Sequence, residues 1–134
     1  MAPLRIGVIG LSTQGWASSA HVTAFDQLKD TIKLTALSTR RAESAKEAAE
    51  KYDVKGYHGD PAQIAQDPNV DLVVVSVAAP YHKEAVWPAI EAGKDVFVEW
   101  PLGKVSFSTS ARLLANMSIT EPCRGQGDRR ICEK

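Results

Sequence analysis

The sequence predicts an α/β protein of the Rossmann type, with a doubly wound parallel sheet of about five strands in the order 3-2-1-4-5. Two observations lead to this prediction. Short apolar runs alternate along the chain with segments of helical periodicity, which calls for a parallel sheet with right-handed crossovers. The first apolar run also ends in Gly10, and Gly15 follows where a helix is expected to begin.

The first half of the chain supplies the strands and helices around this glycine turn. The apolar run before Gly10 is short and uninterrupted, as in a buried strand, and the helix after Gly15 repeats apolar residues at helical spacing. A later alanine- and glutamate-rich stretch favours a helix because both residues have high helix propensity. The expected elements are a strand over 4–9, a helix over 16–28, a strand over 32–38 and a helix over 41–52.

The second half begins with a short extended piece and contains the most strand-like run, DLVVVSV, whose β-branched residues are typical of a strand covered on both faces. Asp60 and Pro61 have the pattern of a helix start, and Gly93 has that of a helix end. Pro88 lacks a backbone donor, so its helix either begins late or kinks. The expected elements are strands over 55–58, 71–77 and 95–98, and helices over 60–66 and 80–92.

The glycine turn has the spacing of the dinucleotide-binding pattern G-x-G-x-x-G, with Ser12 at the middle position. Gly10 allows a sharp turn off the strand, position 12 lies where backbone must approach a pyrophosphate, and Gly15 allows close packing of helix on strand. The phosphates would then meet free backbone N–H groups at a helix start. The predicted cofactor-binding residues here are Gly10, Ser12, Thr13, Gly15 and Trp16.

The end of the second strand indicates which dinucleotide is bound. An acidic residue there binds the ribose hydroxyls in many NAD-specific domains, but this chain has Ser38, Thr39, Arg40 and Arg41 instead. Hydroxyl and guanidinium groups suit a 2′-phosphate, so the sequence favours NADP over NAD. In the alternative interpretation, Arg40 and Arg41 are only a solvated helix start.

Composition excludes several other classes of function. The formal net charge is +0, which gives no electrostatic reason to expect a nucleic acid or an anionic membrane as a direct partner. No apolar run approaches the ~20 residues of a membrane span, and no signal peptide precedes the first strand, so we expect a cytoplasmic protein. The histidines and the two tail cysteines, Cys123 and Cys132, lack the spacing of metal ligands, and no metal site is expected.

Two regions differ in character along the chain. Residues 1–104 carry the alternating strands and helices and form the expected dinucleotide-binding domain. Residues 105–134 begin with a possible short helix over 111–117, after which no periodicity remains, so this tail is predicted to be loop or disordered.

Four motifs resemble those of one known family. They are Ile6-Gly7-Val8-Ile9-Gly10-Leu11, Ala20-His21, Pro80-Tyr81-His82, and AGKDVFVEWPL over 92–102. Over about residues 3–104 the chain resembles the N-terminal nucleotide-binding domain of the glucose-fructose oxidoreductase and inositol dehydrogenase family (Gfo/Idh/MocA). This resemblance implies a Rossmann fold, a bound dinucleotide and, in complete members, hydride transfer on a sugar-like alcohol carbon.

The chain departs from this family at two points. The family motif Glu-Lys-Pro, whose lysine is implicated in catalysis, is here Glu99-Trp100-Pro101. Trp16-Ala17-Ser18 and Glu99-Trp100-Pro101-Leu102 resemble the subgroup related to the yeast galactose repressor, a transcriptional regulator. The family's C-terminal domain, which supplies the substrate pocket, does not follow in this sequence, which suggests a truncated or alternatively read gene product.

The resemblance adds four candidate cofactor contacts, Pro80, His82, Glu99 and Trp100, and no catalytic residue. His82 is either the family histidine near the nicotinamide or a polar residue that begins a helix. Glu99 either contacts the nicotinamide ribose or holds the turn. Trp16 and Trp100 either flank the cofactor or serve packing. His21 is expected to be structural, and His58 to lie on the surface.

Three functions follow as hypotheses. The first is the NADP-binding domain of a Gfo/Idh/MocA-like oxidoreductase; enzymatic activity of the chain itself is left open, because it lacks the lysine. The second is a non-catalytic, dinucleotide-sensing transcriptional regulator that acts through a protein partner, in which case a nuclear location is possible. The third is a remnant with neither activity, which would expose an apolar edge. The sequence gives no prediction of the oligomeric state.

Overall fold

A computed structural model describes residues 2–103 of the chain. The tail over 105–134, with its predicted short helix and loop, lies outside these residues. The strands and helices, in chain order, are β1 (Leu4–Ile9), α1 (Trp16–Ser19), α2 (His21–Gln27), β2 (Ile32–Thr39), α3 (Ala42–Tyr52), β3 (Lys55–His58), α4 (Ala62–Ala65), β4 (Leu72–Val75), the 3-10 helix η1 (Ala79–Tyr81), α5 (His82–Glu91) and β5 (Asp95–Val98).

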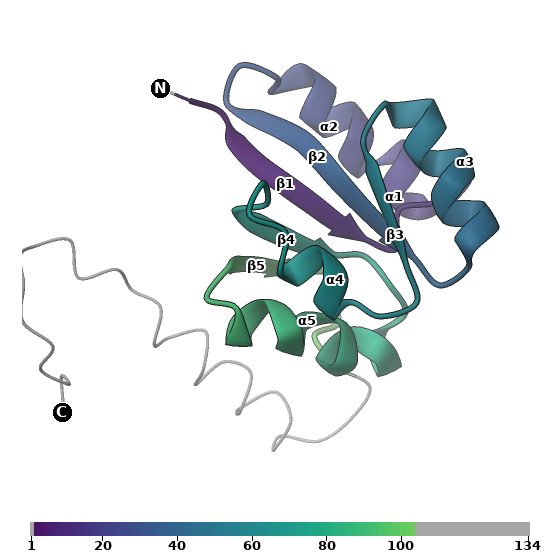
Figure 1. Cartoon of the computed structure of the whole chain (residues 1–134), viewed down its shortest axis with the longest axis vertical. Helices are drawn as coiled ribbons and strands as arrows, with labels where there is room; N and C mark the ends of the chain where they lie inside the picture. Colours follow the sequence, from purple (N-terminus) through teal and green to yellow (C-terminus); the bar gives the residue numbers. More distant parts are fainter. Residues whose placement is uncertain (1, 104–134) are drawn as a thin grey trace, which may run out of the picture.

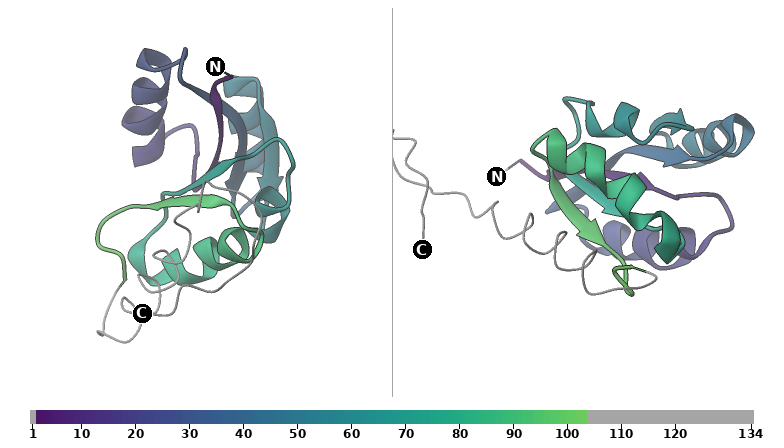
Figure 2. Two further views of the ribbon diagram at one scale, coloured as in Figure 1. Left: turned by 90° about the vertical axis from the view of Figure 1, so that its left-hand side faces the viewer. Right: turned by 90° about the horizontal axis from the view of Figure 1, so that it is seen from below.

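The five strands form one parallel sheet in the order β3-β2-β1-β4-β5, which confirms the predicted fold class. Two layers of helices cover its faces (Figures 1 and 2): α1, α2 and α3 lie on one face, and α4 and α5 on the other. Strands β2 and β3 are added in turn on one side of β1, and strands β4 and β5 are added in turn on its other side. The strand order therefore reverses between β1 and β4, and a crevice is expected there at the carboxyl ends of the strands.

Alternating side chains of the central strands supply the two halves of the core. Ile6 and Val8 of β1 pack with Ala45 and Ala48 of α3 on one face. Ile9, at the end of the same strand, packs on the opposite face with residues of α4 and α5. This explains the near-continuous apolar runs of β1 and β4, because a strand of a parallel sheet is buried on both faces.

Two predicted helices differ from the structure. The helix expected over 16–28 is divided at Ala20 into α1 and α2, which places His21 at the start of α2, where its ring bonds to Glu99. The helix expected over 80–92 begins with η1, and α5 follows from His82 with Pro88 inside it. In the second case a proline, Pro80, lies in the first turn of η1.

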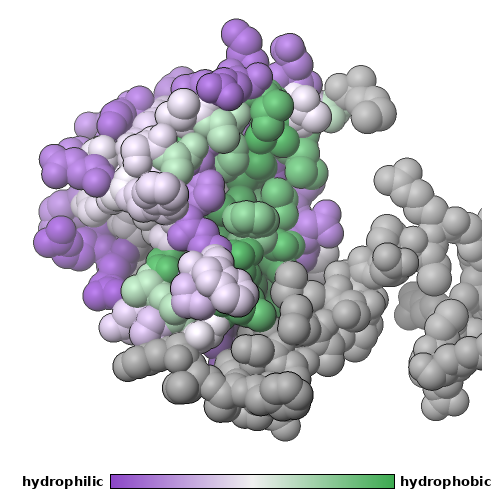
Figure 3. Space-filling model, turned by 180° about the vertical axis from the view of Figure 1, so that it is seen from behind, coloured by the Kyte–Doolittle hydropathy of each residue, from purple (hydrophilic) through white to green (hydrophobic). Residues whose placement is uncertain are grey.

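Part of the α1–α2–α3 face is apolar and open to solvent. Figure 3 shows a band of hydrophobic residues on the side opposite to that of Figure 1, bordered by hydrophilic surface. Leu4, Leu28 and Phe97 are among the large apolar side chains that are exposed. Beyond Ala17, the apolar residues that the two short helices α1 and α2 bring to the core are only partly buried.

An ion pair ties β1 to β4 at the end of the sheet opposite to the crevice. Arg5 binds the Asp71 carboxylate with two side-chain donors, at 2.9 Å from Nε and 2.6 Å from Nη2, and its backbone N–H adds a third bond at 3.0 Å. These bonds favour the charged form and lower the pKa of Asp71 to about 2. The bonds also fix the register at the beginning of both strands.

This pair predicts a loss of stability in acid. The pKa of Asp71 in the folded chain lies below its value of about 3.9 in an unfolded chain. The ion pair therefore adds its full contribution to the free energy of unfolding when the pH is above about 3.9. This contribution is lost as the pH falls from about 4 towards 2. The free energy of unfolding, measured by urea denaturation, should therefore be higher for the wild type than for Asp71→Asn at neutral pH. This difference should close in acid; a difference that is independent of pH would contradict the assignment.

Candidate functional site

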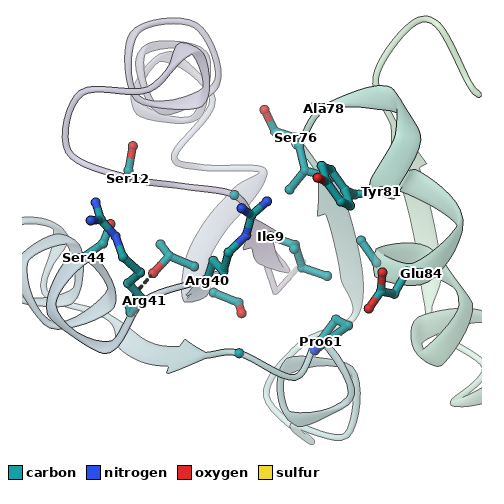
Figure 4. A pocket seen from close by; sticks show the side chains of 16 residues that line it. Ile9, Ser12, Arg40, Arg41, Ser44, Pro61, Ser76, Ala78, Tyr81 and Glu84 are labelled. Atoms are coloured by element: carbon teal, nitrogen blue, oxygen red, sulfur yellow. Dashed lines mark hydrogen bonds between the residues drawn. The ribbon is translucent and has the colours of Figure 1, made fainter. Parts of the chain in front are cut away.

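An open cleft of about 900 Å³ lies at the carboxyl ends of β1, β2 and β4, where the strand order reverses (Figure 4). This is the position at which open α/β sheets bind their ligands, and the volume is within the range of known ligand sites. The residues that line the cleft are Ile9, Gly10, Ser12, Ser38, Thr39, Arg40, Arg41, Ser44, Gly59, Pro61, Ser76, Val77, Ala78, Tyr81, Glu84 and Ala85.

The glycine turn forms one wall of this cleft and has little room for side chains. Gly10 has φ +97, and a Cβ added there would lie 2.0 Å from the carbonyl oxygen of Ser76. A Cβ on Gly15 would lie 2.8 Å from Ser12 Oγ. Gly10 thus allows the loop after β1 to cross close to the end of β4, and Gly15 allows the loop to fold closely on Ser12.

Hydrogen bonds hold the outer part of this loop against α3. Thr13 Oγ1 donates to Glu47 at 3.0 Å, and Lys51 Nζ donates to the Thr13 carbonyl at 3.1 Å. Thr13, Gly15 and Trp16 do not line the cleft, and the Trp16 side chain is exposed at the start of α1. These contacts fix the loop, so that Ser12 is the side chain of the turn that lines the cleft.

The end of β2 brings two guanidinium groups to the opposite wall. Ser38 and Thr39 are buried; the Ser38 carbonyl accepts the Gly10 N–H at 2.7 Å, and the Thr39 hydroxyl donates to the Arg41 carbonyl at 2.9 Å. Arg40 and Arg41 are exposed, and neither forms an ion pair within residues 2–103. Figure 4 shows both side chains at the cleft, and the Arg40 guanidinium stacks over the Tyr81 ring, 5.1 Å from its centroid.

The Pro80-Tyr81-His82 motif, which follows β4, is partly buried. His82 is buried, and its Nε2 donates to the Val77 carbonyl at 2.7 Å. Its Nδ1 lies 3.3 Å from the Leu102 carbonyl oxygen. Neither His82 nor the exposed Pro80 lines the cleft. In this arrangement, His82 links the loop after β4 to the segment after β5.

The motif after β5 contains one anchored and one exposed side chain. Glu99 Oε1 accepts bonds from His21 Nε2 at 2.5 Å and from Ser76 Oγ at 2.9 Å. Trp100, the next residue, is 91% exposed, and neither of the two lines the cleft. His58 is exposed at the end of β3.

Five of the twelve predicted cofactor contacts therefore line one cleft, namely Gly10, Ser12, Ser38, Thr39 and Arg40. The cleft also contains Ser44, Ser76, Tyr81 and Glu84, which the sequence-based prediction did not include. Ser76 had a detectable signal, because it interrupts a β-branched strand near its carboxyl end. Ser44 and Glu84 lie on helices and resemble ordinary surface residues in the sequence.

Residues 2–103 contain neither a metal-ligand cluster nor a membrane-spanning helix. No group of three or more His, Cys, Asp or Glu side chains in this region is placed to hold a metal ion. None of the helices described there is both long and apolar enough to cross a membrane.

A doubly wound sheet with a glycine turn and a cleft at the strand-order reversal defines a dinucleotide-binding domain. Residues 4–117 match the family model GFO_IDH_MocA, described as "Oxidoreductase family, NAD-binding Rossmann fold". The chain belongs to this family, and the predicted resemblance is confirmed.

Relatives of known function include both enzymes and a regulator. The chain is 41% identical over 109 residues to the dehydrogenase aclE of Aspergillus oryzae, with 73% of this chain and 28% of that protein covered. It is 29% identical over 110 residues to the galactose/lactose metabolism regulatory protein GAL80 of Saccharomyces cerevisiae, with 75% and 25% covered. The chain therefore spans only about a quarter of the length of these relatives.

Solved structures show the same fold. The 3-ketoreductase KijD10 of Actinomadura kijaniata, in complex with NADP, matches with a TM-score of 0.75 at 30% identity, over 88% of this chain and 36% of that one. The fold assigned from the sequence is thus shared with a reductase whose structure contains NADP.

Proposed function

We propose that the chain binds NADP(H) in the cleft at the strand-order reversal. The observation that carries this proposal is that the glycine turn and the Arg40–Arg41 pair, which are about thirty residues apart in the sequence, line the same cleft. One wall suits a pyrophosphate, and the other supplies two positive charges with no carboxylate partner among residues 2–103.

The pyrophosphate would lie against the loop from Gly10 to Gly15. The close approach of this backbone to Ser76 leaves no space for a side chain at Gly10, so peptide N–H groups of the turn can face a phosphate directly. The Ser12 hydroxyl, at the position of the middle glycine of the pattern, adds a donor. Helix α1 has only four residues, so the donors of the turn matter more here than a helix dipole.

The 2′-phosphate of NADP would lie at the other wall. Guanidinium groups bind phosphate through paired, charge-assisted hydrogen bonds, and both Arg40 and Arg41 are exposed at the cleft. Arg40 is already oriented there by its stacking on Tyr81. With no acidic residue at the end of β2 to repel this phosphate, NADP is favoured over NAD.

In a complete protein, such a domain would serve an oxidoreductase that moves a hydride between a sugar-like alcohol carbon and the cofactor. The nicotinamide ring supplies this hydride chemistry when it is bound. The family membership and the dehydrogenase relatives support this class of reaction. In this chain, the described residues supply binding and orientation, and a tryptophan stands where the resemblance expects the proton-transferring lysine.

Ligand-dependent stability tests the binding proposal. A ligand that binds only the folded chain raises the free energy of unfolding by about 2.7 kcal/mol at a concentration of 100 times its Kd. The thermal midpoint should therefore rise as NADP is added, and it should rise further than with NAD at the same concentration. A midpoint that neither dinucleotide changes would contradict the proposal.

One specific observation favours a second function, that of a non-catalytic transcriptional regulator that senses the dinucleotide and acts through contacts with a protein partner. Trp100 replaces the expected lysine and is 91% exposed, which suits contact with a protein better than proton transfer. The similarity to GAL80 supports the same alternative. NADP-dependent reduction or oxidation of any sugar or polyol would exclude this function, whereas NADP binding without turnover would favour it.

A further inference from the structure

Three side chains connect the helix after the glycine turn to the wall of the cleft. Glu99, which follows β5, accepts a hydrogen bond from His21 at the start of α2 and another from Ser76 at the end of β4, both on Oε1. The side chains of His21 and Glu99 are each only 20% exposed. These three residues are far apart in the sequence, and the fold brings them together at the carboxyl end of the sheet.

Ser76 is the member of this group that lines the cleft. Its backbone N–H donates to the Ile9 carbonyl at 2.9 Å, and its own carbonyl leaves no room for a Cβ on Gly10. The position of Ser76 is therefore coupled directly to that of the glycine turn. A shift of the Ser76 backbone that accompanies the loss of the bond to Glu99 would therefore move the turn against which the pyrophosphate is proposed to lie.

His21 is well placed to hold Glu99. Its ring stacks on Phe25, with centroids 6.1 Å apart, and meets the edge of Phe97 at 6.3 Å. A carboxylate only accepts hydrogen bonds, so His21 Nε2 carries the proton and donates it. The histidine thus donates to a partly buried carboxylate whose other side-chain partner within residues 2–103 is Ser76.

We propose that His21 and Glu99 are positioning residues for the cleft, and that both act through Ser76. Because the Ser76 hydroxyl donates its proton to Glu99, it presents only lone pairs to the cleft, and its ligand partner must be a donor such as a ribose hydroxyl or an amide N–H. The effect on dinucleotide affinity rests on the proposed function, whereas the coupling of His21 to Ser76 does not.

Amide hydrogen exchange of the ligand-free chain tests this coupling. His21→Leu should make the Ser76 amide exchange about tenfold faster, as for the loss of one hydrogen bond of ordinary strength. Exchange of the α3 amides should not change. His21→Gln, whose side-chain amide can donate to Glu99, should restore most of the protection. Equal acceleration at Ser76 and throughout α3, with no rescue by glutamine, would overturn the proposal.

A double-mutant cycle with NADP tests the functional consequence. His21→Leu should weaken NADP binding by about three- to tenfold, but it should have no further effect in a Ser76→Ala background. Additive losses would show that His21 only stabilises the fold. Thr23→Val is the matched control, because Thr23 is exposed on the same helix and, among residues 2–103, its side chain bonds only to the Ser19 carbonyl. If the wild type does not bind NADP, the proposed function fails, and the exchange experiment still decides the coupling.

Discussion

Gly10→Ala is expected to lower the free energy of unfolding by roughly 2–5 kcal/mol, although it adds only one methyl group. Two effects add at this position. An L-residue at φ +97 is strained, and the new Cβ would lie 2.0 Å from the Ser76 carbonyl oxygen, which is backbone and cannot rotate away. Urea denaturation of the wild type and the variant measures the difference.

Gly93→Ala is the matched control for this substitution. Gly93 also has a positive φ, +68, but an added Cβ would have no neighbour within 4 Å. Only the conformational strain of roughly 1–2 kcal/mol is then expected. If the two variants lost equal stability, the close contact between the glycine turn and the end of β4 would not be a determinant of the fold.

The double variant Arg40→Ala/Arg41→Ala should weaken NADP binding by about 10-fold or more, because even one charge-assisted hydrogen bond to the 2′-phosphate contributes about 1.5–3 kcal/mol. NAD lacks the 2′-phosphate, and its affinity should change by less than about threefold on the same reasoning. Calorimetric titration of each variant with each cofactor measures both effects. An equal loss of affinity for the two cofactors would refute the assignment of these arginines to the 2′-phosphate.

Lys46→Ala provides a control for charge alone. Lys46 is exposed on α3, its ammonium lies 3.9 Å from Glu50, and it does not line the cleft. Its removal should leave the affinity for both cofactors nearly unchanged. A selective loss of NADP affinity in this variant would mean that the general field of the protein, and not the geometry of the cleft, discriminates between the cofactors.

The fold was predictable because its determinants are local. The strand boundaries at 4–9, 55–58 and 95–98 agree with the structure, since each strand ends at a glycine, proline or polar residue that changes the pattern. The division of the first helix at Ala20 was not predictable. The residue after the break, His21, bonds to Glu99, which lies 78 residues away in the sequence, and no local propensity encodes such a contact.

The candidate site was predictable where the backbone at the end of a strand determines which residues face the cleft. The glycine turn and the end of β2 lie at the cleft because strands of a parallel sheet end at the same edge. The other candidates depend on side-chain direction. Glu99 points to His21 and Ser76, and His82 to the Val77 carbonyl, so neither lines the cleft in the ligand-free chain; their contact with a cofactor stays a prediction. Tyr81 ends η1 and Glu84 lies in the first turn of α5, and both line the cleft because the chain passes from η1 into α5 beside it.

Calorimetric titration of the purified chain with NADP and, in parallel, with NAD tests the central claim most directly. The arrangement of the glycine turn opposite Arg40 and Arg41 predicts that one dinucleotide binds per chain and that NADP binds more tightly than NAD. If neither dinucleotide bound at millimolar concentration, the cleft would not be a dinucleotide site. If NAD bound more tightly than NADP, the assignment of the two arginines would be contradicted.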